Sequence, residues 1–222
     1  MTVLWISWFV ASAADVGRLV ILDARTGKPR IEVRSPIAAY SPATYSPTGH
    51  QILAASPQQE LLVLDANTGD VMRRLPTNNT ATAGPLTVMA SWASHGGEIL
   101  ELRRSLTDPK LRPGTAFVRD AKSGEVKFKL EDADHGIGNA IFSPDGKSII
   151  TTGQEHASLT WWEASTGQRT RVLVEMWSGN GVVRGVTLAE NGRIGRWWNP
   201  DLAAPMDAGS VKIEHLHEGY SD

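Results

Sequence analysis

FSPDGKSIITTGQEHASLTWWEASTGQ, residues 142–168, contains two tight turns that each lie beside an apolar run. In the first turn, Pro144 presets the φ of a turn position and Gly146 can adopt the positive φ that ends the turn. Residues 148–153 then leave this turn as a predicted strand. A second turn, residues 163–167, follows the tryptophan pair. The stretch therefore predicts consecutive strands joined by turns.

Both turns recur along the chain, so they belong to the architecture. The second turn reads LDARTG at 22–27, LDANTG at 64–69, RDAKSG at 119–124 and WEASTG at 162–167, with a weaker copy at 198–201. The first turn reads YSPTGHQIL at 45–53, WASHGGEIL at 92–100 and FSPDGKSII at 142–150. The turn glycines Gly27, Gly69, Gly124 and Gly167 lie 42, 55 and 43 residues apart. These intervals are within or near the period of four-stranded propeller blades.

The longest of these intervals contains two insertions. One falls in PTNNTATAGP, residues 76–85, and the other in RRSLTDPKLRPG, residues 103–114. Insertions confined to loops, while the strands keep their spacing, are what a repeat fold predicts. We therefore predict loops at both places.

The apolar patterns distinguish inner from outer strands. Residues 19–22 and 61–64 are continuously apolar, which predicts strands covered on both faces. After the second turn, Glu125, Lys127 and Lys129 alternate with apolar residues, which predicts a half-exposed outer strand whose charges discourage edge pairing. Buried inner strands with an exposed outer strand are typical of a propeller blade.

The predicted fold is an all-β propeller of four-stranded antiparallel blades in a single domain over residues 1–222. The five blade motifs lie near residues 8–35, 37–75, 86–130, 137–173 and 177–217. Counting back from Asp23 leaves no room for an innermost strand in the first blade. Either the chain closes a small ring or it forms a partial propeller, which we favour. Open blade faces would be apolar and would allow self-association.

The sequence resembles the WD-repeat (WD40-type) β-propeller family. The resemblance rests on FSPDGKSIITTG, on Trp162-Glu163 in the place of the family's Trp-Asp, and on the TG turn that follows; repeat-like sequence covers roughly residues 8–200. It implies a non-catalytic protein–protein interaction scaffold that presents loop surfaces to a protein or peptide partner. We expect no cofactor and a cytoplasmic location.

The sequence also departs from this family. No Trp-Asp dipeptide occurs, and no Gly-His dipeptide stands at the family's place, so the family's buried Asp-His-Ser/Thr-Trp hydrogen-bond network is not predicted. LVILDARTGK, residues 19–28, also looks like the repeats of quinoprotein-type and lactonase-like propellers. The alternatives are therefore a propeller enzyme, or a fragment of a larger seven- or eight-bladed propeller.

The composition limits the kinds of partner and of chemistry that we expect. The formal net charge is −2 and the Lys and Arg residues are scattered. Because a nucleic-acid-binding surface needs clustered positive charge, a nucleic-acid partner is disfavoured. Cysteine is absent, which excludes disulfides and thiolate chemistry. The apolar run at 3–10 is too short to span a membrane and is interpreted as a buried strand; the alternative is an export signal over residues 1–13.

The search for chemistry yields no catalytic, cofactor-binding or metal-binding residue. EDADHG at 131–136 lacks a calcium-loop spacing, and EHLHE at 214–218 offers two histidines without an evident third ligand. The insertion at 103–114 stands out because it carries four cations against one acid. Arginine suits bidentate binding of carboxylates and phosphates. We therefore predict partner binding by Arg103, Arg104, Lys110 and Arg112.

Overall fold

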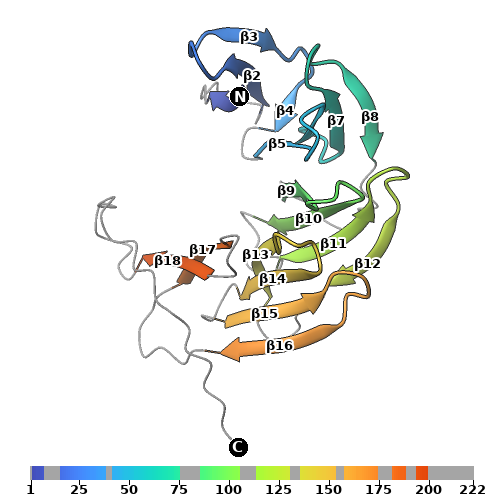
Figure 1. The fold of residues 1–222 in the computed structure, drawn as a ribbon, viewed down its shortest axis with the longest axis vertical. Coiled ribbons are helices and arrows are strands. Elements are labelled where there is room, and N and C mark those ends of the chain that lie inside the picture. Colours follow the sequence, from blue (N-terminus) through green and yellow to red (C-terminus); the bar gives the residue numbers. More distant parts are fainter. Residues whose placement is uncertain are drawn as a thin grey trace, which may run out of the picture.

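The computed structural model of the chain is all-β (Figure 1). It describes residues 2–7, 16–38, 42–75, 86–105, 114–130, 136–153, 158–174, 182–188 and 194–199. Within these ranges every regular element is a strand and no helix occurs. A helix long and apolar enough to cross a membrane is accordingly not found among them.

The described strands form five antiparallel sheets, numbered here in chain order. The first two sheets contain β1 (Thr2–Ser7), β2 (Val16–Asp23), β3 (Pro29–Glu32) and β4 (Ile37–Ala38), and then β5 (Thr44–Tyr45), β6 (Gln51–Ala55), β7 (Leu61–Asp65) and β8 (Val71–Leu75). The third sheet contains β9 (Leu86–Trp92), β10 (Glu98–Ser105), β11 (Thr115–Asp120) and β12 (Val126–Leu130).

The fourth sheet contains β13 (Ile137–Phe142), β14 (Ser148–Gly153), β15 (Ser158–Glu163) and β16 (Arg169–Val174). The fifth is a pair, β17 (Val182–Leu188) and β18 (Ile194–Asn199). In the second, third and fourth sheets, strand order follows sequence order. The first sheet differs: β1 pairs with β2 in the way that β6 pairs with β7, and no described strand occupies the inner side of β1.

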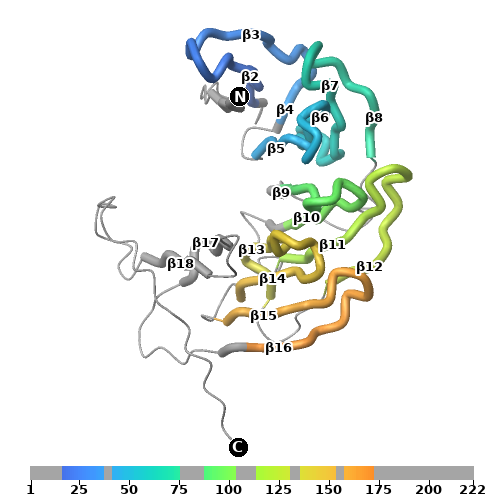
Figure 2. The backbone as a smooth tube through the Cα atoms, in the orientation of Figure 1, coloured from blue at the N-terminus to red at the C-terminus, as the bar shows by residue number. Residues whose placement is uncertain are grey.

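The sheets follow one another along an arc (Figure 1). β3, β8, β12 and β16 lie along its convex edge, and β5, β9 and β13 lie toward its inner side. The chain passes along the arc in sequence order, from blue to orange in Figure 2. Each sheet therefore contacts the sheet that is next in the sequence, as β6 contacts β9 and β10 contacts β13.

Apolar side chains fill the space between successive sheets. One cluster joins Leu19 and Ile21 of β2 to Ile52 and Leu64 of the second sheet, all with 0% of their surface exposed. Two further clusters lie between the second and third sheets and between the third and fourth. Burying one such side chain contributes about 1.5–3 kcal/mol. The clusters confirm that residues 61–64 form a strand covered on both faces. For residues 19–22 the prediction was wrong on one face: Leu19 and Ile21 are buried against the second sheet, whereas Val20 and Leu22 on the other face are only partly buried.

The outer strands are half exposed, as their alternation predicts. In β12, Leu130 is buried, Phe128 is partly buried, and both lysines are exposed. Val126 differs, with 36% of its surface exposed, because the pairing of β11 with β12 shifts register between Val118 and Arg119. A bulge of this kind changes which side chains face the neighbouring sheet.

Both recurring turns have the predicted geometry. Gly49 and Gly146 adopt φ of 73° and 70°, and each donates its N–H to the carbonyl of the serine three residues earlier at 2.9 Å. In the second turn of the first three sheets, the aspartate side chain accepts hydrogen bonds from the backbone N–H groups two and three residues later, as Asp65 does from Asn67 and Thr68 at 2.7 and 3.0 Å.

The two turns of a sheet lie side by side at one end of it. A backbone hydrogen bond of 2.9 Å joins them in three sheets, from Ala66 N to His50 O, from Ala121 N to Gly97 O and from Ala164 N to Lys147 O. We call the end of a sheet that carries both turns the turn end. The opposite end, the loop end, carries the connections between the second and third strands of each sheet, residues 56–60, 106–114 and 154–157.

The predicted loop at 103–114 begins later than expected. β10 extends through Ser105, so Arg103 and Arg104 belong to a strand. Residues 106–113 and the other predicted loop, 76–85, lie outside the described residues. Part of the longest repeat interval is therefore taken up by a longer strand, eight residues in β10 against five in β6.

Candidate interaction site

The four cations predicted to bind a partner do not form one described cluster. Arg103 lies on β10 and has only 9% of its side chain exposed. Its Nε donates to Glu101 Oε1 at 2.5 Å, and its guanidinium stacks over the Phe117 ring with Cζ 4.9 Å from the centroid. The side chain of Arg104, and all of Lys110 and Arg112, lie outside the described residues. Arg103 is thus held inside the protein, while the binding role of the set stays a prediction.

Glu101 is the centre of a buried ionic cluster between the second and third sheets. Its side chain is 0% exposed, and Arg119 Nε donates to its Oε2 at 2.5 Å. Arg119 also donates from Nη1 to the carbonyl oxygen of Gly124 at 2.7 Å. Removing charges from water costs several kcal/mol per ion, and hydrogen-bonded partners offset that cost. The cluster holds one carboxylate and two guanidiniums, and Arg103 Nη2 is buried without a hydrogen-bond partner among the described residues.

Sequence reasoning missed this cluster, although the repeat alignment contained the information needed to find it. Glu101 stands nine residues after Trp92, as Ala54 does after Tyr45 and Thr151 after Phe142. The partner position precedes the acid of the second turn and holds Leu64, Arg119 and Trp162. In the fourth sheet, Trp162 Nε1 donates to Thr151 Oγ1 at 2.9 Å. One inter-sheet position is therefore apolar, ionic and polar in three successive sheets.

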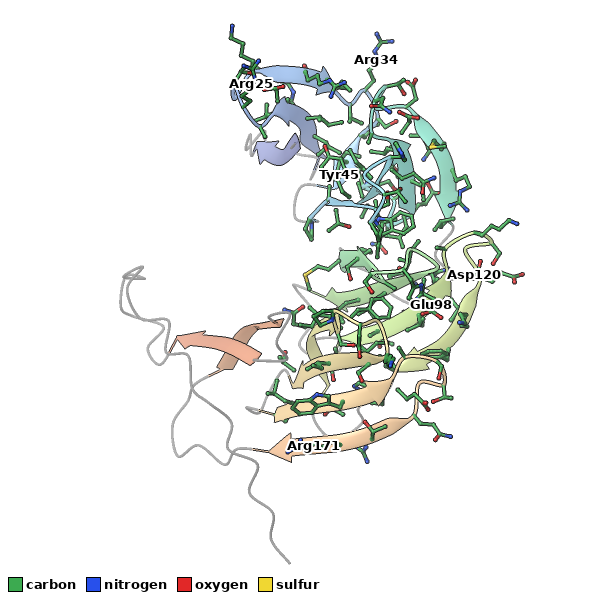
Figure 3. The ribbon with its side chains drawn as sticks, in the orientation of Figure 1. Arg25, Arg34, Tyr45, Glu98, Asp120 and Arg171 are labelled. Carbon is green, nitrogen blue, oxygen red and sulfur yellow. The ribbon has the colours of Figure 1, made fainter. Side chains whose placement is uncertain are left out.

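Other contacts tie the second and third sheets together at the convex edge. Arg73 of β8 donates from Nη2 to the carbonyl of Ala121 at 2.8 Å and also bonds the carbonyl of Lys122. Within the third sheet, Lys127 of β12 pairs with Glu98 of β10. Glu98 and Asp120 both lie in the third sheet, with Asp120 in its second turn (Figure 3). This junction therefore combines apolar packing with the two hydrogen bonds that Arg73 donates across it.

The turn aspartates are electrostatically stabilised as anions. The hydroxyl of Thr26 and its backbone N–H hold the pKa of Asp23 below its usual value. The backbone N–H of Ser123 does the same for the pKa of Asp120, and the Ser143 hydroxyl for that of Asp145. Hydrogen bonds to a carboxylate favour its charged form. These groups shape turns and offer no acid–base pair.

One sheet face has no described cover. Val20 and Leu22 of β2 are only partly buried, whereas Leu62 and Leu64, the corresponding residues of β7, are 0% exposed. No described cluster of buried residues lies on this side of the first sheet. We call the surface formed by Arg18, Val20, Leu22, Ala24 and Glu32 the uncovered face.

The turn glycines show the same difference. A Cβ added to Gly69, Gly124 or Gly167 would meet side chains of the preceding sheet, at 2.9 Å from Ile31, 2.7 Å from Leu75 and 2.5 Å from Phe128. At Gly27, which has the same positive φ, no described atom lies within 4 Å. The first sheet therefore presents a surface that its counterparts bury against a neighbour.

No group of three His, Asp or Glu side chains that could hold a metal occurs among the described residues. The two stretches considered for metals, His135 with Glu131, Asp132 and Asp134, and residues 214–218, lie outside them. Comparison with known proteins gives no relative: no protein-family model matches the chain, and neither does any curated protein.

Proposed function

We propose that the chain is a non-catalytic interaction module, a partial propeller of the WD-repeat type that presents its loop end to a protein or peptide partner. The observation that carries this proposal is the difference between the two ends of the sheets. At the turn end, two turn types repeat with the same hydrogen bonds. At the loop end, connections of different span follow the strands, and the most basic of them starts at the end of β10.

The propeller part of the proposal is supported by the succession of sheets along an arc, each packed on the next (Figure 1). The WD-repeat part is supported by the hydrogen bond from Trp162 to Thr151 at 2.9 Å. This bond matches the Trp and Ser/Thr half of the family's buried network. The His half would have to come from residues outside those described.

Guanidinium chemistry suggests the kind of partner. Arg103 is committed to Glu101, so Arg104, Lys110 and Arg112 are left as the cations for an exposed binding role. Arginine and lysine at a loop end attract carboxylates, and arginine can bind one through two parallel hydrogen bonds. An acidic peptide segment is the expected ligand.

The test compares two triple variants that change net charge equally. Arg104→Glu/Lys110→Glu/Arg112→Glu alters the loop end, and Lys28→Glu/Lys122→Glu/Lys147→Glu alters exposed lysines at the turn end. Binding of short acidic, neutral and basic peptides is measured by fluorescence anisotropy. We expect acidic peptides to bind the wild type and the turn-end variant, and to bind the loop-end variant about tenfold more weakly or worse. Equal binding by both variants, or binding without regard to peptide charge, would contradict the proposal.

A further inference from the structure

The uncovered face of the first sheet has the residue types of a buried surface. Its apolar centre, Val20 and Leu22, occupies the positions that β7 fills with fully buried leucines. Ala24 is partly buried, while Ala66, Ala121 and Ala164 at the same turn position are 8%, 6% and 3% exposed. These residues keep accessible a part of the apolar surface that the other sheets bury, and removing such surface from water favours association.

The margin of this face is charged in a balanced way. Arg18 lies two residues before Val20 on β2, and Glu32 pairs with Val20 in register on β3. Arg18 Nε donates to Glu32 Oε1 at 2.8 Å, and the two side chains are 58% and 55% exposed. The face thus offers one cation and one anion, both accessible, beside its apolar centre.

We infer that the uncovered face binds the same face of a second copy of this chain, as a two-fold dimer. A two-fold interface brings a surface against itself, so that surface has to be self-complementary. Two apolar centres meet in such a contact, and each guanidinium can approach the carboxylate of the other copy. Two sheets pack face to face in this way about 10 Å apart.

The two-fold arrangement is favoured over a head-to-tail one by what lies at the other end of the arc. There β17 packs against β13 and β14, so the fourth sheet is already occupied on its inner strands. A first sheet from another copy could not lie flat on it. A dimer through two first sheets needs no surface that the described residues already cover. This inference deepens the proposed function, since it names one partner of the module, but it uses a different surface from the loop end.

The experiment is light scattering with size-exclusion chromatography over a range of concentrations. We expect the wild type to pass from monomer to dimer as concentration rises. Leu22→Arg places a charge in the apolar centre and should raise the dissociation constant about tenfold or more. Met72→Arg is the matched control, because Met72 is 52% exposed on β8, away from the face. It should dimerise like the wild type. Unchanged circular dichroism confirms that each variant folds.

A charge-reversal mixture separates the two-fold contact from any other. Arg18→Glu gives a face with two carboxylates, and Glu32→Arg gives a face with two guanidiniums. Each variant alone should be monomeric through repulsion, and an equimolar mixture should form the heterodimer. A wild type that stays monomeric would overturn the inference, as would a dimer insensitive to Leu22→Arg, assemblies larger than a dimer, or a mixture that does not associate.

Failure here and failure of the proposed function are distinguishable. The loop-end variant should still dimerise, because its changes lie on another sheet. Leu22→Arg should still bind acidic peptides. Loss of one property without the other identifies which of the two proposals is wrong.

Discussion

Glu101, between Arg103 and Arg119, stands at a position that the neighbouring sheets fill with Ala54 and Thr151. The apolar, ionic and polar versions of this position differ in the defect that a single substitution creates. Truncating an apolar side chain leaves a cavity, whereas truncating Glu101 leaves two buried guanidiniums without their carboxylate. An uncompensated buried charge costs more than the pair contributed. The ionic junction is therefore the one most sensitive to a change at a single position.

The corresponding prediction contrasts one substitution with three. Glu101→Ala should lower the free energy of unfolding by about 3–5 kcal/mol. Glu101→Ala/Arg103→Ser/Arg119→Leu copies Ala54, Ser56 and Leu64 of the second sheet and removes every charge of the cluster. It should recover most of that loss, because no buried ion remains unpaired. Urea unfolding at neutral pH measures both, and a triple variant no more stable than the single one would contradict this account.

Among the elements, the second turn has two separate reasons for its glycine. The positive φ, 79° at Gly124 and 67° at Gly27, disfavours any residue with a Cβ. At Gly124 the preceding sheet also approaches closely, and a Cβ would lie 2.7 Å from Leu75 Cδ2. At Gly27 only the first reason applies to the described atoms. The pair therefore separates backbone conformation from inter-sheet packing.

Gly27→Ala and Gly124→Ala test that separation. Gly27→Ala should cost about 1–2 kcal/mol of unfolding free energy for the left-handed backbone. Gly124→Ala should cost the same plus about 1–3 kcal/mol, because Leu75 is buried and cannot move away freely. Chemical denaturation of the two variants gives the difference directly. Equal losses would mean that the third sheet does not press on the second at this turn.

The turn aspartates predict how stability depends on pH. Hydrogen bonds hold the pKa of each of these aspartates below its ordinary value in the folded state, so the folded state binds fewer protons than the unfolded chain in acid. The stabilisation is complete above about pH 5 and is lost as the pH falls through the lowered pKa values. Asp23→Asn/Asp120→Asn/Asp145→Asn should therefore be less stable than the wild type near neutral pH. The difference between the denaturation midpoints of the two proteins should shrink as the pH is lowered toward about 2. A constant difference would assign the effect to something other than titration.

Much of the element level follows from the sequence alone. The turns, the glycines at positive φ, the burial of β7 on both faces and the exposed outer strands follow from turn residues and from apolar periodicity, whereas β2, which has the same apolar pattern as β7, is buried on one face only. Two further features were not predicted. Val126 is exposed because of a bulge in the pairing of β11 with β12, and β10 extends to Ser105 because it stays paired with β9 as far as Leu86. Register shifts and strand lengths depend on neighbouring strands, so a single strand's sequence does not reveal them.

For the whole molecule, the arrangement along an arc means that the stability of each sheet depends on its packing against neighbouring sheets. Each sheet is held by contacts with the sheets before and after it, as in other repeat proteins. The second and third sheets have apolar clusters on both faces. Among the described residues, the first sheet has such a cluster only on the face toward the second sheet. It should therefore open at lower free energy than the sheets behind it.

Hydrogen exchange checks this gradient in samples dilute enough to be monomeric. Amides of β6, β7, β10 and β11 should exchange most slowly, and amides of β2 should exchange faster than those of β7 even though the two strands have similar sequences. Protection of β2 should increase when concentration is raised and the face is covered. Equal exchange of β2 and β7 in the monomer would show that the first sheet gains its stability elsewhere.

The bond from Ala164 N to Lys147 O, repeated in the two preceding sheets, fastens the two turns of a sheet to each other and leaves the opposite end unconstrained by it. The sequence at the loop end can thus vary without a loss of stability at the turn end. For engineering, the arc is a display platform. A foreign epitope inserted between β14 and β15 would lie at the loop end, while the register of these strands is fixed at the turn end. Successive sheets would offer several such insertion points at regular spacing.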